Sequence, residues 1–97
     1  MKTKQSKTDL WEPDLPEPDS RGNYPALAAL AVLQARDILR ARRQLGLSQV
    51  DLARRAGIRP ETLNRIEHGR NKPSIPTITK IERALRAVAS LGDLDLA

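Results

Sequence analysis

The sequence of 97 residues contains no cysteine and no phenylalanine, and tryptophan and tyrosine occur once each. Without cysteine the chain can form neither disulfides nor zinc fingers, and thiol catalysis is excluded. Without phenylalanine, any hydrophobic core must consist of leucine, isoleucine, valine and alanine. The absence of cysteine also fits a reducing compartment.

Long apolar stretches and catalytic clusters are missing as well. The longest apolar stretch, residues 25–33, is too short to cross a bilayer, and no apolar segment follows the N-terminal lysines as in a secretory signal. There is one histidine, no cluster of metal ligands and no glycine-rich phosphate loop. We therefore expect a cytoplasmic protein that is not an enzyme and needs no metal or cofactor.

Basic residues are concentrated in the C-terminal part of the chain. Residues 1–33 hold four Lys or Arg against five Asp or Glu, whereas residues 34–97 hold thirteen against seven. Most of these thirteen are arginines, whose planar guanidinium group fits phosphates and guanine edges. This distribution indicates a nucleic-acid partner. On charge alone, an arginine-rich surface that only keeps the protein in solution is equally consistent.

Proline dominates the N-terminal arm, residues 1–24. Between Pro13 and Pro18 a proline recurs every two or three residues, which prevents a helix and favours an extended chain. Few apolar groups can offset the ordering entropy, so we expect a mobile arm. Its large apolar residues form a candidate partner-binding motif flanked by acids: Leu10, Trp11, Leu15 and Tyr24. The equally weighted alternative is that Trp11 folds back onto its own domain.

Residues 25–90 have the pattern of a compact helical domain, and residues 91–97 form a short acidic tail. From Pro25 to Leu45, apolar residues recur at helical spacing, which predicts a long first helix with one apolar face. The members of this face are Leu27, Leu30, Ala31, Ile38 and Leu45.

Three further helices are expected to follow. Ser48 is suited to cap a helix over residues 49–56, with Asp51 as the acid of a capping box. Pro60 would open a third helix at its first position, and Ser74 would cap a last long helix. The side chains expected inside are Val50, Leu52, Ala53, Leu63, Ile66, Ile78, Ile81, Leu85 and Val88.

The second and third predicted helices form a candidate helix-turn-helix. Ala53 is small enough for the two helices to cross closely, and Gly57 permits the positive φ of a tight turn. The third helix would present polar side chains near its N-terminus, which is the end that a recognition helix places in the major groove. These outward side chains are Arg59, Glu61, Thr62 and Arg65.

Four stretches closely resemble the Xre-type helix-turn-helix family of Cro and the phage repressors. They are residues 45–53, 56–58, 63–70 and 72–74, which read LGLSQVDLA, AGI, LNRIEHGR and KPS. The resemblance covers about half of the chain. It implies an all-α fold, a compact four- to five-helix lambda-repressor-like DNA-binding domain with an extended N-terminal arm. Arg59 departs from the family pattern, because Ser or Thr is common at that N-cap.

The resemblance also implies roles for single residues. Base edges would be read by Arg59, Glu61, Thr62 and Arg65, with Arg65 suited to guanine and Glu61 to cytosine. Phosphates would be held by Gln49, His68, Arg70, Asn71 and Lys72. Arg42 and Glu67 would form a structural ion pair. For Glu61, stabilisation of the helix dipole is an equally weighted alternative.

A helix-turn-helix with an N-terminal extension resembles the HigA-like antitoxins of type II toxin–antitoxin modules. The resemblance implies a homodimer that binds a palindromic double-stranded operator, represses its own operon and neutralises a small basic RelE/ParE-like toxin. The acids of the arm would suit such a partner. The last helix and the leucines of the tail are the expected dimer surface. The alternatives are a stand-alone phage-type or metabolic repressor and a protein-interaction adaptor.

Overall fold

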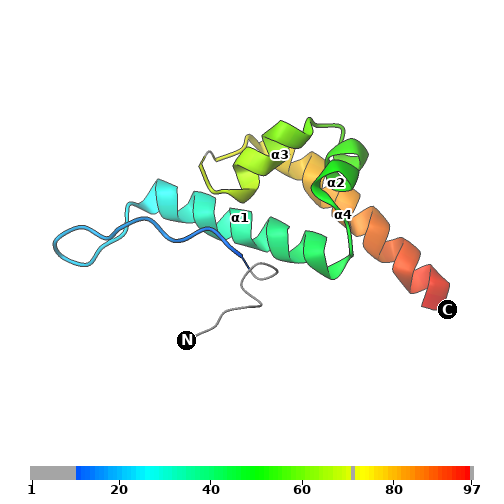
Figure 1. The fold of residues 1–97 in the computed structure, drawn as a ribbon, viewed down its shortest axis with the longest axis horizontal. Coiled ribbons are helices and arrows are strands. Elements are labelled where there is room, and N and C mark those ends of the chain that lie inside the picture. The colour runs from blue at the N-terminus through cyan, green and yellow to red at the C-terminus, as the bar shows by residue number, and fades with distance from the viewer. Residues whose placement is uncertain (1–10, 71, 97) are drawn as a thin grey trace.

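A computed structural model of the chain describes residues 11–70 and 72–96, the last five of these by their backbone alone. These residues form four helices without a strand: α1 (Ala26–Gln44), α2 (Gln49–Ala56), α3 (Pro60–Glu67) and α4 (Ile75–Leu96) (Figure 1). The predicted all-α fold class is therefore confirmed. None of these helices is long and apolar enough to cross a membrane.

Local sequence signals set the ends of the short helices. Ser48 caps α2, because its Oγ accepts a hydrogen bond of 3.0 Å from the backbone N–H of Asp51. The carboxylate of Asp51 accepts a hydrogen bond from Arg54 at 2.9 Å. Of the two bonds of the predicted capping box, the described one is therefore that from the backbone of Asp51 to Ser48. Pro60 occupies the first turn of α3, where its missing N–H leaves no donor unpaired. At the start of α4, Ser74 Oγ accepts from the backbone N–H of Thr77 at 3.3 Å.

Two glycines give the turns around α3 their shape. Gly57 and Gly69 both have a φ of 72°, in the left-handed region that other residues enter only with strain. Gly69 is also packed tightly, since a Cβ built there would lie 3.0 Å from Cγ2 of Val32 and 3.2 Å from its Cα. The turn after α3 thus lies directly against the backbone of α1.

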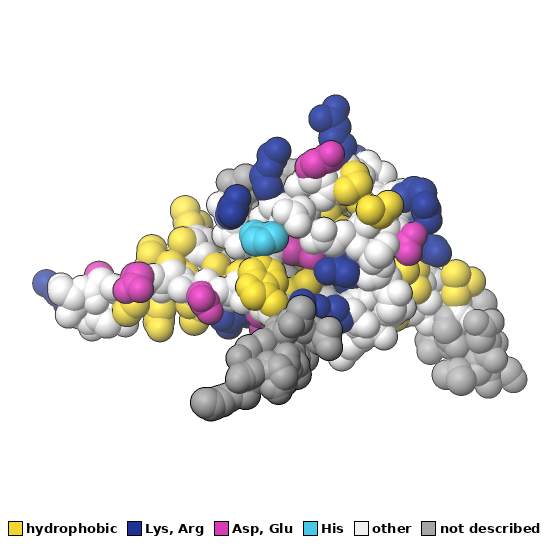
Figure 2. Space-filling model, in the orientation of Figure 1, with side chains coloured by type: hydrophobic (Ala, Val, Ile, Leu, Met, Phe, Trp, Pro, Cys, Tyr) yellow, Lys and Arg dark blue, Asp and Glu magenta, His cyan; other side chains and the backbone are white. Residues whose placement is uncertain are grey.

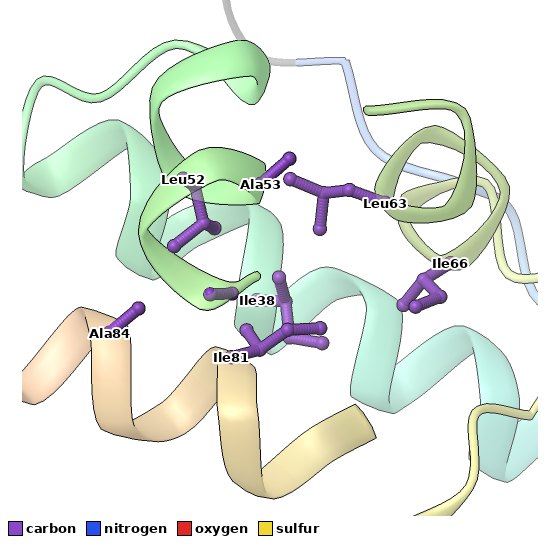
Figure 3. Packing of buried hydrophobic residues seen from close by; sticks show 8 residues of the cluster. Ile38, Leu52, Ala53, Leu63, Ile66, Ile81 and Ala84 are labelled. Atoms are coloured by element: carbon purple, nitrogen blue, oxygen red, sulfur yellow. The ribbon is translucent and has the colours of Figure 1, made fainter. Parts of the chain in front are cut away.

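A small aliphatic core holds the four helices together (Figure 3). Leu52, Leu63 and Ile81, from α2, α3 and α4, are completely buried, and Ile38 joins them from α1. The cluster consists of Ile38, Leu52, Ala53, Ala56, Leu63, Ile66, Ile81 and Ala84. The expected burial of Val50 is wrong, because this side chain lies on the outer side of α2 and is 56% exposed.

The two halves of α1 have different surroundings. Ile38 and Leu39 in the C-terminal half are buried, whereas Leu27 and Leu30 in the N-terminal half are 70% and 50% exposed. Figure 1 shows that this N-terminal half extends beyond the other helices. In that half, Ala31 and Val32 are nevertheless buried, so the predicted apolar face is divided between buried and exposed side chains.

The arm lies against α1 instead of standing free of the domain. Residues 11–18 are extended and run beside α1 in the opposite direction, and a turn at Asp19 returns the chain (Figure 1). Pro13 is buried, and its carbonyl accepts a hydrogen bond of 2.9 Å from Nε of Arg36. Arginines of α1 thus supply hydrogen-bond partners for this segment of the arm, whose mobility stays a prediction.

Helix α4 is longer than expected and continues to Leu96. Residues 91–96, predicted as part of a tail, thus belong to the helix. Three leucines favour the helix in this stretch, and Gly92, which costs about 1 kcal/mol in a helix, does not end it.

Candidate nucleic-acid interface

Helices α2 and α3 are joined by a short turn whose backbone N–H groups form hydrogen bonds with the end of α2. The N–H groups of Gly57 and Ile58 donate to the carbonyls of Arg54 and Ala53 at 3.2 and 3.0 Å, which closes the C-terminal end of α2. Figure 3 shows Ala53 facing Leu63 of α3, and both side chains are completely buried. The small Ala53 side chain thus lets the two helices pack closely and fixes the direction of α3.

The outer side of α3 carries exposed polar side chains that share one open hollow. Glu61 and Arg65 are exposed and lie one helical turn apart. The α3 hollow, as we name it, has a volume of about 450 Å³ and is lined by Gln49, Pro60, Glu61, Asn64, Arg65 and Arg70. Two predicted base readers and two predicted phosphate ligands are thus brought together on one surface. Figure 2 shows dark blue basic side chains along this upper side of the molecule.

The other two predicted base readers lie at the margins. Arg59 is the exposed N-cap of α3, and its side chain makes no capping bond. Thr62 is half-buried and lines a smaller hollow of about 100 Å³ beside the first, together with Arg65, Pro73 and Thr77. Thr62 therefore faces the loop before α4.

A buried ion pair ties α1 to the end of α3. Nε and Nη2 of Arg42 donate to the two carboxylate oxygens of Glu67 at 2.7 and 2.9 Å, and Glu67 is 1% exposed. A third bond runs from Nη1 of Arg42 to the carbonyl of Leu47 at 2.9 Å. One guanidinium group thus links α1, α3 and the turn before α2.

Gln49 belongs to the same network. Its amide nitrogen donates to Glu67 at 2.9 Å, and its amide oxygen accepts from Asn64 at 3.3 Å. Gln49, expected to hold a phosphate, thus has its side chain fixed by α3. Asn64 was not predicted as a site residue, although its spacing of three residues from Glu61 places it on the same side of the helix.

The predicted phosphate ligands that follow α3 are divided in space. Arg70 lines the α3 hollow, whereas Lys72 is exposed beside Leu30 and Leu33 of α1. His68 is half-buried, and its Nδ1 donates to the carbonyl of Asn64 at 2.7 Å. Asn71 lies outside the described residues.

The arm reaches this part of the domain through Trp11 and Glu12. The ring of Trp11 lies 4.8 Å from that of His68, centroid to centroid, at an interplanar angle of 45°. Glu12 accepts two hydrogen bonds from Arg40 at 2.6 and 2.7 Å. The Arg40 hydrogen bond holds the pKa of Glu12 below its usual value; slight burial opposes this effect, and the charges of nearby arginines support it.

The predicted partner-binding residues do not form one free surface. Trp11 contacts its own domain, Leu15 is half-buried and Tyr24 is 48% exposed, while Leu10 lies outside the described residues. The structure also exposes three leucines of α1, Leu27, Leu30 and Leu33, which the sequence analysis does not place on the surface. The sequence does indicate an additional apolar surface here, because residues 26–35 contain no charged residue and are more apolar than a helix with one buried face requires.

Two short helices joined by a glycine turn, with polar side chains on the outer side of the second, define the helix-turn-helix class of DNA-binding proteins. A comparison with family models agrees, since the helix-turn-helix model of the Cro and phage-repressor type matches residues 38–89, more than half of the chain. The chain belongs to this helix-turn-helix family and is a DNA-binding regulator of transcription. Neither the curated proteins nor the solved structures that were compared contain a significant match.

Proposed function

We propose that this regulator is a sequence-specific repressor that binds a palindromic operator and also serves as the antitoxin of a toxin–antitoxin pair. The observation that carries the DNA-binding part is the α3 hollow, where Glu61 and Arg65 lie beside Gln49 and Arg70. In a major groove, the fork of Arg65 would donate to O6 and N7 of guanine, and Glu61 would accept from N4 of cytosine. Arg70 would hold the adjacent backbone phosphate.

The proposal includes a homodimer, because one recognition helix contacts too few base pairs to define an operator. In a dimer, the two copies of α3 would enter successive major grooves about 34 Å apart on one side of the DNA. The C-terminal part of α4 supports such pairing, since Val88 is only half-buried and Leu91 is 54% exposed. Repression would follow from occupation of the promoter by the dimer. Such a protein acts by binding alone, and we place it in the cytoplasm together with its operator.

The antitoxin role is supported by surface that the DNA-binding role leaves unused. Leu27, Leu30 and Leu33 are exposed on α1, yet none of them lines the α3 hollow. Exposed acids of the arm, such as Asp14 and Glu17, would repel DNA and attract a basic protein. A small basic toxin is a partner of that kind.

A stand-alone repressor is the second candidate, and the arm favours it. Trp11 and Glu12 contact His68 and Arg40 of their own domain, as expected for an arm that is an integral part of the fold. The two candidates differ in one observable, which is whether the gene next to that of this chain encodes a toxic protein that the chain neutralises on coexpression.

The DNA-binding part is tested with Arg65→Ala on the DNA upstream of the chain's own gene. The variant should bind about 1–3 kcal/mol more weakly and lose its preference at one base pair, because one bidentate contact is removed. Fluorescence anisotropy with single-base substitutions across the operator measures both effects. Arg21→Ala removes an equal charge from the exposed turn of the arm and serves as the control. An Arg65→Ala protein with the wild-type base preference would refute the assignment.

A further inference from the structure

An apolar surface on the N-terminal half of α1 is not covered by any described part of the domain. Leu27, Leu30 and Leu33 are 70%, 50% and 47% exposed and follow one another at helical spacing, with Tyr24 just before them. We call these four residues the α1 apolar face. Figure 2 shows hydrophobic side chains gathered over this protruding part of the molecule. A cluster of large exposed apolar side chains is typical of a surface that another protein covers.

The α1 apolar face includes a concave part. Leu30 and Leu33 line an open hollow of about 290 Å³, which is bounded by Gln34, Asp37 and Lys72. A hollow with two leucines and a polar border can receive an apolar side chain of a partner. The surface thus offers both a protruding helix and a place for an anchoring residue.

Acidic side chains lie beside the α1 apolar face. The extended segment of the arm runs along the same half of α1 and exposes Asp14, Glu17 and Asp19 (Figure 1). Asp14 and Glu17 form no ion pair with another residue of the described part of the chain. Residues 11–35 carry four acids against one arginine, which is opposite in sign to the rest of the domain.

This charge favours a basic partner over a second copy of the chain. A homodimer through the α1 apolar face would bring two acidic segments together, and like charges at an interface oppose association. A basic protein gains both from burial of the leucines and from attraction to the acids.

We propose that the α1 apolar face and the acids beside it are the docking site for a small basic protein with an apolar anchor. The proposal rests on the antitoxin function and gives its partner a location. The site lies on α1 and the exposed arm acids, and it does not require release of Trp11 from His68. It is also separate from the α3 hollow, and of the predicted DNA contacts only Lys72 borders it, so substitution of the leucines and of Arg65 can separate the two binding activities.

The test uses the purified full chain and, as probe, the purified product of the gene adjacent to that of the chain. The double variant Leu30→Ser/Leu33→Ser should bind this protein at least about 100-fold more weakly in titration calorimetry, because two central apolar contacts are lost. Ile75→Ser removes an exposed apolar side chain at the start of α4, outside the α1 apolar face, and it should change the affinity less than about threefold. The wild type, the double variant and the control variant should have the same affinity for the operator if the α3 hollow is intact.

Two further variants keep the test decisive. Leu27→Ser changes the most exposed leucine of the face and should weaken binding even if the double variant does not fold. Asp14→Asn/Glu17→Gln should lower the association rate about tenfold at low salt, and high salt should remove the difference.

The possible outcomes separate the site from the function on which it rests. If the wild type binds the probe and all α1 variants bind it equally well, the docking site is wrong while the antitoxin function stands. If the wild type does not bind the probe, both are overturned. If sedimentation shows that the wild type is a dimer and Leu30→Ser/Leu33→Ser a monomer, the face is covered by a second copy and the proposal is overturned.

Discussion

Replacement of Arg42 by methionine tests whether the buried ion pair holds the helix-turn-helix in place. Arg42 and Glu67 are 14% and 1% exposed, and Arg42 donates two hydrogen bonds to the carboxylate and one to the carbonyl of Leu47. Methionine fills a similar volume without a charge. In the Arg42→Met variant, Glu67 would be left buried with its bond from Gln49 as its described partner.

The expected loss of stability is large for a domain of this size. Removal of one partner of a buried ion pair costs about 3–5 kcal/mol, because the remaining charge stays desolvated. In a domain of fewer than 100 residues, each kcal/mol lowers the melting temperature by about 4–8 °C, so the Tm should fall by at least about 12 °C. The change should also reduce operator binding, because Glu67 orients Gln49 at the edge of the α3 hollow.

Thermal unfolding followed by circular dichroism measures this effect. The control is Arg54→Met, which breaks an exposed pair with Asp51 and should cost less than about 0.5 kcal/mol. The double variant Arg42→Met/Glu67→Met should recover most of the lost stability, because it leaves no buried charge. An Arg42→Met protein that melts with the wild type would show that the pair does not hold α1 and α3 together.

Two further predictions concern Lys72 and Glu12. Lys72→Ala should reduce the slope of log K against log salt for operator binding by about 0.9, and an unchanged slope would contradict a phosphate contact. The hydrogen bond from Arg40 lowers the pKa of Glu12 below its usual value of 4.5. The ion pair therefore stabilises docking of the arm at pH values above 4.5, and this contribution is lost as the pH falls through the lowered pKa. Fluorescence of Trp11, the single tryptophan, should report this acid transition in the wild type, whereas a Glu12→Gln protein with the same transition would refute the assignment.

The region from α2 to α3 could be predicted from the sequence almost residue by residue. Ser48, Gly57 and Pro60 each act on the backbone within a few residues of their own position, so their effects do not depend on the rest of the fold. The predicted bounds of α2 agree with the structure for the same reason. Glu61 and Arg65 could be placed on the outer side of α3 because helical periodicity decides that question locally.

The position of the arm could not be predicted in this way. It depends on contacts such as that of Glu12 with Arg40, which are 28 residues apart in the sequence. Composition correctly indicates an extended chain with few apolar groups. Composition does not show whether arginines of α1 face that chain. The sequence therefore cannot decide between a free arm and an arm docked on its own domain.

Helical periodicity has a related limit in α1. It shows that Leu27, Leu30 and Ile38 share one side of the helix, but it cannot show where the partner helices end. Ile38 and Ala31 are buried, whereas Leu27 and Leu30, which both precede Ala31 in the sequence, are exposed, so one predicted face supplies both core and surface residues. The hydrogen bonds of Gln49 with Glu67 and Asn64 could not be predicted either. The family pattern indicates which residues contact DNA, but it says less about the residues that hold those side chains in position.

The anchoring of the arm is compatible with two surfaces of opposite charge on one small domain. A DNA-binding surface needs uncompensated arginines, and an acidic arm placed across α3 would neutralise them. The ion pairs that join the described arm to the helices instead use Glu12 with Arg36 and Arg40, which lie on α1 and do not line the α3 hollow. Docking of the arm thus leaves Arg65 and its neighbours open to DNA and keeps the remaining acids beside the α1 apolar face. In this arrangement, a change of Glu12 should alter binding of a basic protein partner more than binding of the operator.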